Sequence, residues 1–373
     1  MLFRSVFGFT LSGAIQAFVT KNRMEEVLGN HRPKTIAKAS FLGAVSSSCS
    51  YAASALAKSL VTKGADFTAA MVFMFASTNL VLELGLILWV LIGWQFALAE
   101  FVGGAIMIIL LTLIMPRLFN DIQVGKKSLQ MVEMSKGKAT WKDACGYTIG
   151  DFTMVRVELI LGFAVAGLAT IVPVSFWNKL FLTGNGFLSA LENAFISPFI
   201  AFISFVCSVG NVPLAAALWH SGISFGGTIA FIYADLLAAP LVLIYRKYYG
   251  SKIAVRLAIA FWLIMSLSGL ITEGIFNTFK LTPVVANHQM MMNHFGLNYT
   301  TILNAISLLL AIWVYWMYRG RRIENSDFAK DLVCGMQVRI ADAPASVEYK
   351  RKMYYFCMPG CKDAFLNSPE KYL

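Results

Sequence analysis

Long apolar stretches alternate with short polar loops along most of the chain. Each stretch runs for about 20 residues with few charges, the length that an α-helix needs to cross ~30 Å of hydrocarbon. The stretches predict seven membrane-spanning helices, at Leu2–Thr20, Phe67–Ile92, Phe96–Met115, Tyr147–Val172, Ile223–Tyr245, Ile253–Thr278 and Tyr299–Tyr318.

Two more segments, Phe41–Val61 and Ala194–Trp219, are apolar but interrupted by polar and small residues. Basic residues gather in four regions, 21–38, 117–142, 246–256 and 319–322, which should all face the cytoplasm. The four regions share one side if each segment enters the membrane and returns to the side from which it came. We therefore predict two re-entrant hairpins, an N-terminus outside and a C-terminal tail in the cytoplasm.

The two hairpins align without gaps when Cys49 is placed on Cys207, and Gly64 then falls on Gly222. Each half reads span, polar loop, hairpin, glycine, span, span, with the hairpins entering from opposite sides. This order predicts an inverted repeat, as in secondary transporters. The repeats cover about 1–115 and 147–279, and an extra span covers 299–318. In the second hairpin we expect the backbone to open between Gly210 and Pro213.

The composition agrees with an all-α polytopic membrane protein. The 373 residues are 58% hydrophobic and 14% charged, whereas soluble domains carry about 25% charged residues. A β-barrel would instead show alternation in segments of about ten residues. The net charge of +11 follows from the basic loops and does not indicate nucleic-acid binding. No nucleotide-binding pattern and no catalytic histidine set is recognisable, so we expect a gradient-driven process and not an enzyme.

Polar residues within apolar spans are the candidate substrate pathway, because ionisable groups in hydrocarbon are costly and are functional candidates by default. Asp235 is the strongest candidate and is expected to carry a coupling proton. The pair Asn79 and Glu83 lies four residues apart on one helix face. The hairpins add Ser48, Cys49 and Ser50 from the first, and Cys207, Ser208 and Asn211 from the second.

Simpler interpretations stay open for several of these residues. Serine and cysteine in the hairpins could merely let helices pack closely. The carboxylates of Glu83, Glu158 and Glu273 could be paired or interfacial. Asp151 and Arg156 are expected at the cytoplasmic interface.

The composition becomes polar from Asp327 to Leu373. Three potential thiolates lie in this tail, and soft ligands of this kind favour Cu(I) or Zn(II). The alternative is that the cysteines only pack in a small core. The order of Asp331, "VCGM", "YYFC", Phe365 and Tyr372 resembles the YHS domain. That resemblance implies a small α+β metal-binding module at 327–373, with Cys334, Cys357 and Cys361 as ligands and the Met336 thioether close by.

The membrane part, about 1–320, resembles the predicted permease family that includes bacterial organoarsenical efflux permeases. The resemblance rests on "GAVSSSCSYAASALAKSLVTKGADFTAAMVFMFAS" and "FVCSVGNVPLAAALWHSGISFGGTIAFIYADLLAAP". Members often carry Cys-x-Cys-Gly or Cys-Ser before the first broken helix, whereas this chain has Ser48-Cys49-Ser50 with one thiol, so a multi-thiolate site would need Cys207 as well.

An outer-side loop, "NHQMMMNH", offers a second set of soft ligands: His288, Met290, Met291, Met292 and His294. Thioethers prefer Cu(I) or Ag(I), although a chance methionine run at the end of a span is the alternative.

These observations predict a secondary-type permease of the bacterial inner membrane that exports a Cu(I)-like ion or a trivalent arsenical. Its partners are the lipid bilayer, the substrate and a cytoplasmic metal donor; transport itself needs no cofactor. The alternatives are a membrane-anchored metal chaperone or sensor, and a permease for a non-metal small molecule. The oligomeric state stays open.

Overall fold

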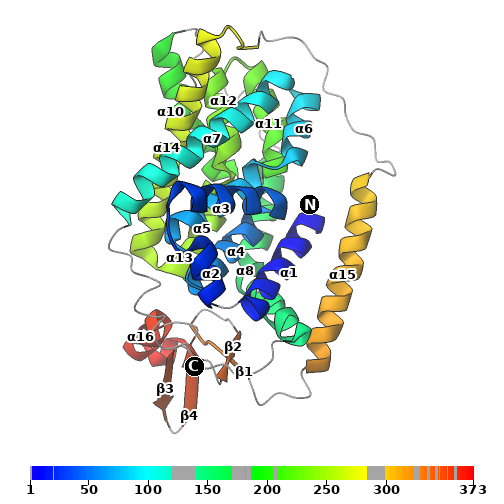
Figure 1. Ribbon diagram of the computed structural model, residues 1–373, viewed down its shortest axis with the longest axis vertical. Coiled ribbons are helices and arrows are strands. Elements are labelled where there is room, and N and C mark those ends of the chain that lie inside the picture. Colours follow the sequence, from blue (N-terminus) through cyan, green and yellow to red (C-terminus); the bar gives the residue numbers. More distant parts are fainter. Residues whose placement is uncertain are drawn as a thin grey trace.

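The computed structural model describes residues 2–19, 21–119, 140–169, 181, 186–204, 208–283 and 299–321 of the membrane part, and 328–333, 337–340, 343, 345–350, 352–356 and 359–373 of the tail. An elongated bundle of helices forms the body, and a small domain with strands lies at its lower end (Figure 1).

The first half of the body contains seven helices among the described residues: α1 (Leu2–Phe18), α2 (Lys21–Leu28), α3 (Pro33–Ser46), α4 (Ser50–Thr62), α5 (Phe67–Asn79), α6 (Leu82–Leu91) and α7 (Trp94–Leu118). The second half contains α8 (Trp141–Ala169), α10 (Phe187–Ser204), α11 (Ser208–His220), α12 (Phe225–Tyr233), the 3₁₀ turn η2 (Ala234–Leu237), α13 (Ala239–Tyr249) and α14 (Ser251–Thr278). Helix α15 (Tyr299–Arg321) then leads to the tail.

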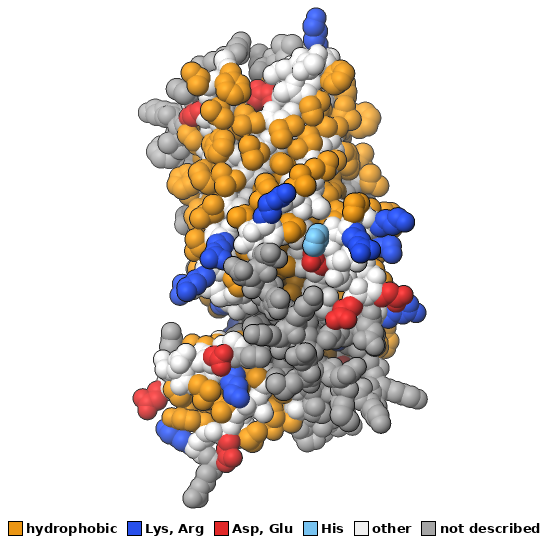
Figure 2. All heavy atoms as spheres, turned by 60° about the vertical axis from the view of Figure 1, so that its left-hand side comes forward, with side chains coloured by type: hydrophobic (Ala, Val, Ile, Leu, Met, Phe, Trp, Pro, Cys, Tyr) orange, Lys and Arg blue, Asp and Glu red, His pale blue; other side chains and the backbone are white. Residues whose placement is uncertain are grey.

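The body has the surface of a membrane protein. Four described helices are long and apolar enough to cross a bilayer, and six crossings result if each of two bent helix pairs counts as one. Large apolar side chains such as Leu82, Val90 and Trp316 are exposed. Figure 2 shows hydrophobic side chains covering most of one face of the body, with most charged side chains below them. The prediction of a polytopic helical membrane protein is therefore confirmed.

Two predicted spans are not continuous helices. The predicted Phe67–Ile92 divides into α5 and α6, which bend by 41°, and the predicted Ile223–Tyr245 divides into α12 with η2 and α13, which bend by 42°. In the second case Pro240 is at the start of α13, so the Leu236 carbonyl lacks a helical donor. The Tyr245 hydroxyl donates to that carbonyl at 3.0 Å and holds the bend.

The same turn occurs in both halves, at positions that the sequence alignment pairs. Gly64 has φ +99° and Gly222 has φ +96°. The amide of Gly64 donates to Val61 O and that of Gly222 to Trp219 O, each at 3.0 Å. Left-handed backbone after a helix favours glycine, so the aligned glycines terminate α4 and α11 in the same way.

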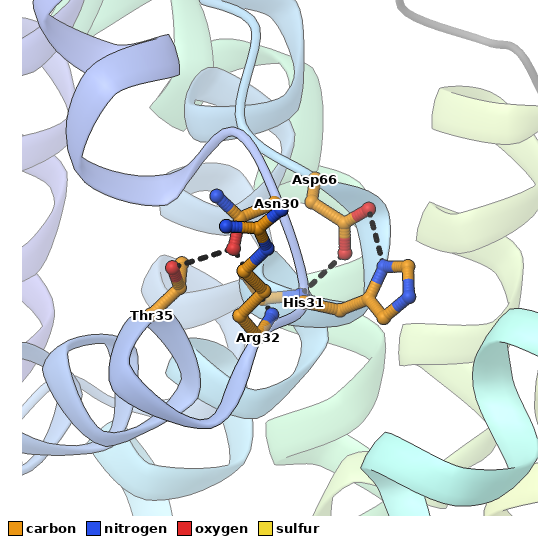
Figure 3. A network of polar contacts seen from close by, with 6 residues as sticks. Asn30, His31, Arg32, Thr35 and Asp66 are labelled. Carbon is orange, nitrogen blue, oxygen red and sulfur yellow. Dashed lines mark hydrogen bonds and ion pairs between the residues drawn. The ribbon is translucent and has the colours of Figure 1, made fainter.

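The two arms of the first hairpin, α3 and α4, are joined by a turn in which Ser47 has φ +38°. Their outer ends are tied together as well. His31 Nδ1, next to α3, lies 3.4 Å from Asp66 Oδ2, just beyond α4 (Figure 3). The Asp66 amide also donates to Leu28 O at 2.7 Å. The segment therefore begins and ends at the same end of the bundle.

The second hairpin differs from the expectation in two respects. The segment from Gly210 to Pro213 does not open, because it lies within α11. Pro213 removes one helical hydrogen bond, the one that its amide would have given to Val209 O, and α11 nevertheless continues to His220. The first arm, α10, also starts at Phe187, seven residues before the predicted Ala194.

The tail contains two antiparallel sheets of two strands, β1 (Phe328–Lys330) with β2 (Gln337–Arg339) and β3 (Ala345–Tyr349) with β4 (Lys352–Phe356). Helix α16 (Pro359–Asn367) and the turn η4 (Pro369–Lys371) follow. Phe356, Cys361 and Phe365 form the buried centre. Such a core is small for independent stability.

Candidate functional site

The tip of the first hairpin is anchored to the end of α5. Cys49 is the N-cap of α4, and its sulfur accepts from the Ala52 amide at 3.4 Å. The Ser48 amide donates to Ser77 O at 3.0 Å. These bonds satisfy backbone groups that the interrupted helix leaves open, which a membrane interior requires. The half-buried Cys49 thiol is thereby held beside the first residue of α4.

Polar side chains from both halves meet next to this tip. Ser50 Oγ donates to Asp235 Oδ2 at 2.8 Å, and Asn79 Nδ2 donates to Asp235 Oδ1 at 3.1 Å. All three side chains are at most 1% exposed. Ser50 begins α4, Asn79 ends α5 and Asp235 lies in η2. Three helix interruptions therefore converge on one carboxylate.

A fourth residue, Glu100 of α7, belongs to this group. It is fully buried, and the hydroxyl of Tyr233, two residues before Asp235, donates to its backbone oxygen at 2.9 Å. Within the described part of the chain, neither oxygen of its carboxylate has a hydrogen-bond partner. We call Ser50, Asn79, Glu100 and Asp235 the core cluster. Sequence reasoning missed Glu100, although a carboxylate within the predicted span Phe96–Met115 was a usable signal.

Among the remaining predicted pathway residues, the structure describes Glu83 and Asn211. Glu83 is partly exposed in the first turn of α6. Asn211 is buried in α11, and neither amide atom has a partner among the described residues. Cys207 lies outside the described residues, and so do the side chains of Ser208 and Glu158.

Asp151, predicted at the cytoplasmic interface, is buried within the bundle at 2% exposure. Its Oδ2 accepts from Ser12 Oγ and from Gln16 Nε2, both at 2.7 Å. Ser12 also contacts Ser59 Oγ of α4 at 3.0 Å. The packing of α1 against α8 encloses the Asp151 carboxylate. This packing could not be predicted from the sequence. Arg156, in contrast, is exposed.

Glu273 is paired, in agreement with the simpler interpretation of this residue. Its Oε2 accepts from the Gly226 amide at 3.0 Å, which lies in the first turn of α12. A carboxylate at this position satisfies an open amide and interacts favourably with the helix dipole. Glu273 therefore has a structural task that needs no substrate.

Most predicted metal ligands fall outside the described residues. These are Cys334, Met336 and Cys357 in the tail, and His288, Met290, Met291, Met292 and His294 in the outer loop. Cys361 is described, and it is 5% exposed beside Phe356 and Phe365. No group of three His, Cys, Asp or Glu residues that could hold a metal occurs within the described ranges.

Comparisons with known proteins agree with the architecture. Residues 2–274 match the predicted permease family ArsP_1, and residues 329–373 match the YHS domain. A Mycobacterium tuberculosis protein, Rv2963, whose name describes it as a permease, is 44% identical over 319 residues, which cover 79% of this chain and 78% of that protein. No solved structure gives a significant match. The chain therefore belongs to the predicted permease family ArsP_1 and carries a C-terminal YHS domain.

Proposed function

We propose that this protein is a secondary-type permease that exports a soft metal ion or a trivalent metalloid species from the cytoplasm. The observation that carries the proposal is the buried network of Ser50, Asn79 and Asp235, which joins both halves beside the Cys49 thiol. Buried polar groups where interrupted helices meet are the usual substrate sites of secondary transporters.

The proposed architecture is an inverted repeat with two re-entrant hairpins. The matched turns at Gly64 and Gly222 support the repeat. The contact between His31 and Asp66 supports the return of the first hairpin to its starting side. Gly227, in the first turn of α12, lies against Asn193 in the first half of α10, which supports the same path for the second.

The proposed orientation places the YHS domain in the cytoplasm of a bacterium and the N-terminus outside the inner membrane. Helix α2, which begins the region 21–38 with its five Lys and Arg residues, and the tail lie at the same end of the bundle in Figure 1. Lys and Arg are retained preferentially on the cytoplasmic side, so both would face the compartment from which substrate is taken.

The proposed substrate chemistry follows from the thiols. Cys49 is held at the hairpin tip, and the repeat assigns Cys207 to the equivalent tip of the second hairpin. Thiolates prefer soft ions such as Cu(I), Ag(I) and trivalent arsenic over hard ones. Ser50 and Asn79 would add oxygen ligands, and Asp235 would supply negative charge for a cationic substrate.

We further propose that the YHS domain binds Cu or Zn through Cys334, Cys357 and Cys361, with Met336 nearby. A ligand set of thiolates and a thioether suits such ions. The buried Cys361, packed against Phe365, would link metal binding to the folding of a small core. The domain would then collect or sense the ion before export.

Accumulation of Cu, Ag, Zn and methylarsenite by cells that express the protein tests the export function. The Cys49→Ser/Cys207→Ser double variant is compared with Cys145→Ala, which removes a buried thiol from α8. The proposal expects lower accumulation of one species with the wild type and with Cys145→Ala, and loss of that effect in the double variant. Export that survives in the double variant at equal protein levels would refute the thiol site.

Deletion of residues 327–373 separates transport from a chaperone or sensor role. A permease should keep measurable export without the tail, because the membrane pathway remains intact. Complete loss of function, with the truncated protein still present in the membrane, would favour a membrane-anchored chaperone or sensor.

A further inference from the structure

Glu100 is the acid of the core cluster whose charge is least compensated. It is 0% exposed, and none of the described residues offers a hydrogen bond to either carboxylate oxygen. Its backbone is fixed, since the Tyr233 hydroxyl donates to Glu100 O at 2.9 Å. Burying an ionised carboxylate without a partner costs several kcal/mol or more, so this side chain requires a proton or another cation.

Asp235 has the opposite environment. Each of its two oxygens accepts a hydrogen bond, one from Ser50 and one from Asn79. An ionised carboxylate is an acceptor only, and donors on both oxygens match that state. The two acids therefore differ in what the protein provides for them, although Tyr233, two residues before Asp235, is hydrogen-bonded to the backbone of Glu100.

Two ionised carboxylates in one buried site repel each other, so a pair of this kind holds a proton between them. The acid that lacks donors is the better place for it. One more acceptor, Asn79 Oδ1, has no partner among the described residues, and the same amide donates to Asp235. A protonated Glu100 would carry no net charge and would add a hydrogen-bond donor to a cluster that contains an open acceptor.

The elements around α7 bring few other titratable groups. Helix α5 contributes none. Tyr233 of α12 donates to backbone oxygens of Ala99 and Glu100. Glu273 of α14 is bonded to Gly226, and Tyr245 of α13 to Leu236. Glu83 of α6 is partly exposed at the start of its helix. Arg117 is near the end of α7, 17 residues after Glu100. Lys252 and Arg256 are near the start of α14, at the opposite end of that helix from Glu273.

We propose that Glu100, and not Asp235, carries the proton that drives export, while Asp235 stays ionised as the acceptor of Ser50 and Asn79. This inference rests on the proposed permease function. The proton would enter from the outer side, bind one Glu100 oxygen and leave to cytoplasmic water, and the substrate would move outward in exchange. Asp235 would remain available to attract a cationic substrate.

Infrared spectroscopy of the purified full-length protein tests the location of the proton without any substrate. Only protonated carboxyl groups absorb in the acid carbonyl region, so wild type minus Glu100→Gln at pH 7.5 should show one such band. The Asp235→Asn variant should keep the band. The proposal is overturned if the difference spectrum of wild type minus Glu100→Gln shows no such band. It is also overturned if the band persists in Glu100→Gln and disappears in Asp235→Asn.

Transport in proteoliposomes gives the second readout, with Ag(I) and methylarsenite as probes. Glu100→Gln should still exchange the probe across the membrane. The factor by which a pH gradient accelerates this transport should be at least tenfold smaller in Glu100→Gln than in the wild type. A Glu100→Gln variant that still responds to the gradient as wild type does contradicts the proposal. If wild type moves neither probe, the proposed substrate class fails, whereas the infrared result still decides where the proton resides.

Discussion

The hydrogen bond between Ser50 and Asp235 should contribute measurably to stability, because it joins the two halves of the body. Hydrogen bonds to charged groups contribute about 1.5–3 kcal/mol in soluble proteins, whereas bonds between membrane helices average about 0.6 kcal/mol and reach about 1.7. The bond of 2.8 Å is fully buried, so we expect a coupling free energy of about 1.5 kcal/mol, or tenfold in the unfolding equilibrium.

A double-mutant cycle measures this coupling. The wild type, Ser50→Ala, Asp235→Asn and the double variant are unfolded by detergent titration in mixed micelles, and the interaction term is taken from the four free energies of unfolding. Ser54→Ala is the matched control. Its hydroxyl, one turn along the same helix, donates to Tyr51 O at 2.6 Å, so it should show no coupling with Asp235→Asn.

The reasoning would be refuted by a Ser50–Asp235 coupling below about 0.3 kcal/mol, which is the level expected for independent sites. A coupling equal to that of the Ser54 control would have the same meaning. Either outcome would mean that the contact between the hairpin tip and η2 contributes nothing measurable to the free energy of unfolding.

Three more expectations concern other parts of the chain. Gly64→Ala and Gly222→Ala should each lower the free energy of unfolding by about 1–2 kcal/mol, because both glycines have left-handed φ. The control Gly274→Ala, within α14 and with open space around it, should not lower it. Thermal unfolding of the three variants measures the difference. Asp66→Ala should cost about 1 kcal/mol through loss of the α5 N-cap bond to Ala69 N, measured by detergent unfolding, and an unchanged midpoint would contradict this. Cys361→Ser should lower the amount of Cu or Zn that co-purifies with the protein, measured by elemental analysis, and an unchanged content would remove this thiol from the ligand set.

The matched turns at Gly64 and Gly222 could be predicted from sequence because their features are local. A glycine after a helix predicts a left-handed turn wherever it occurs, and the gapless alignment pairs Gly64 with Gly222 on residue order alone. The apolar spans were equally visible, since membrane thickness fixes their length. The breaks within α5–α6 and α12–α13 were not, because polar residues such as Asn79 are also compatible with a continuous helix.

The sequence by itself determined a polytopic helical membrane protein with a polar tail, and it singled out Ser50, Asn79 and Asp235 as separate candidates. Only the tertiary structure decided that these three residues meet, that Glu100 joins them and that Asp151 is buried. Side chains from four helices converge through packing across the two halves, and hydropathy along one segment carries no information about which segments pack together. The distinction between an acid with two donors and an acid with none exists only after that packing.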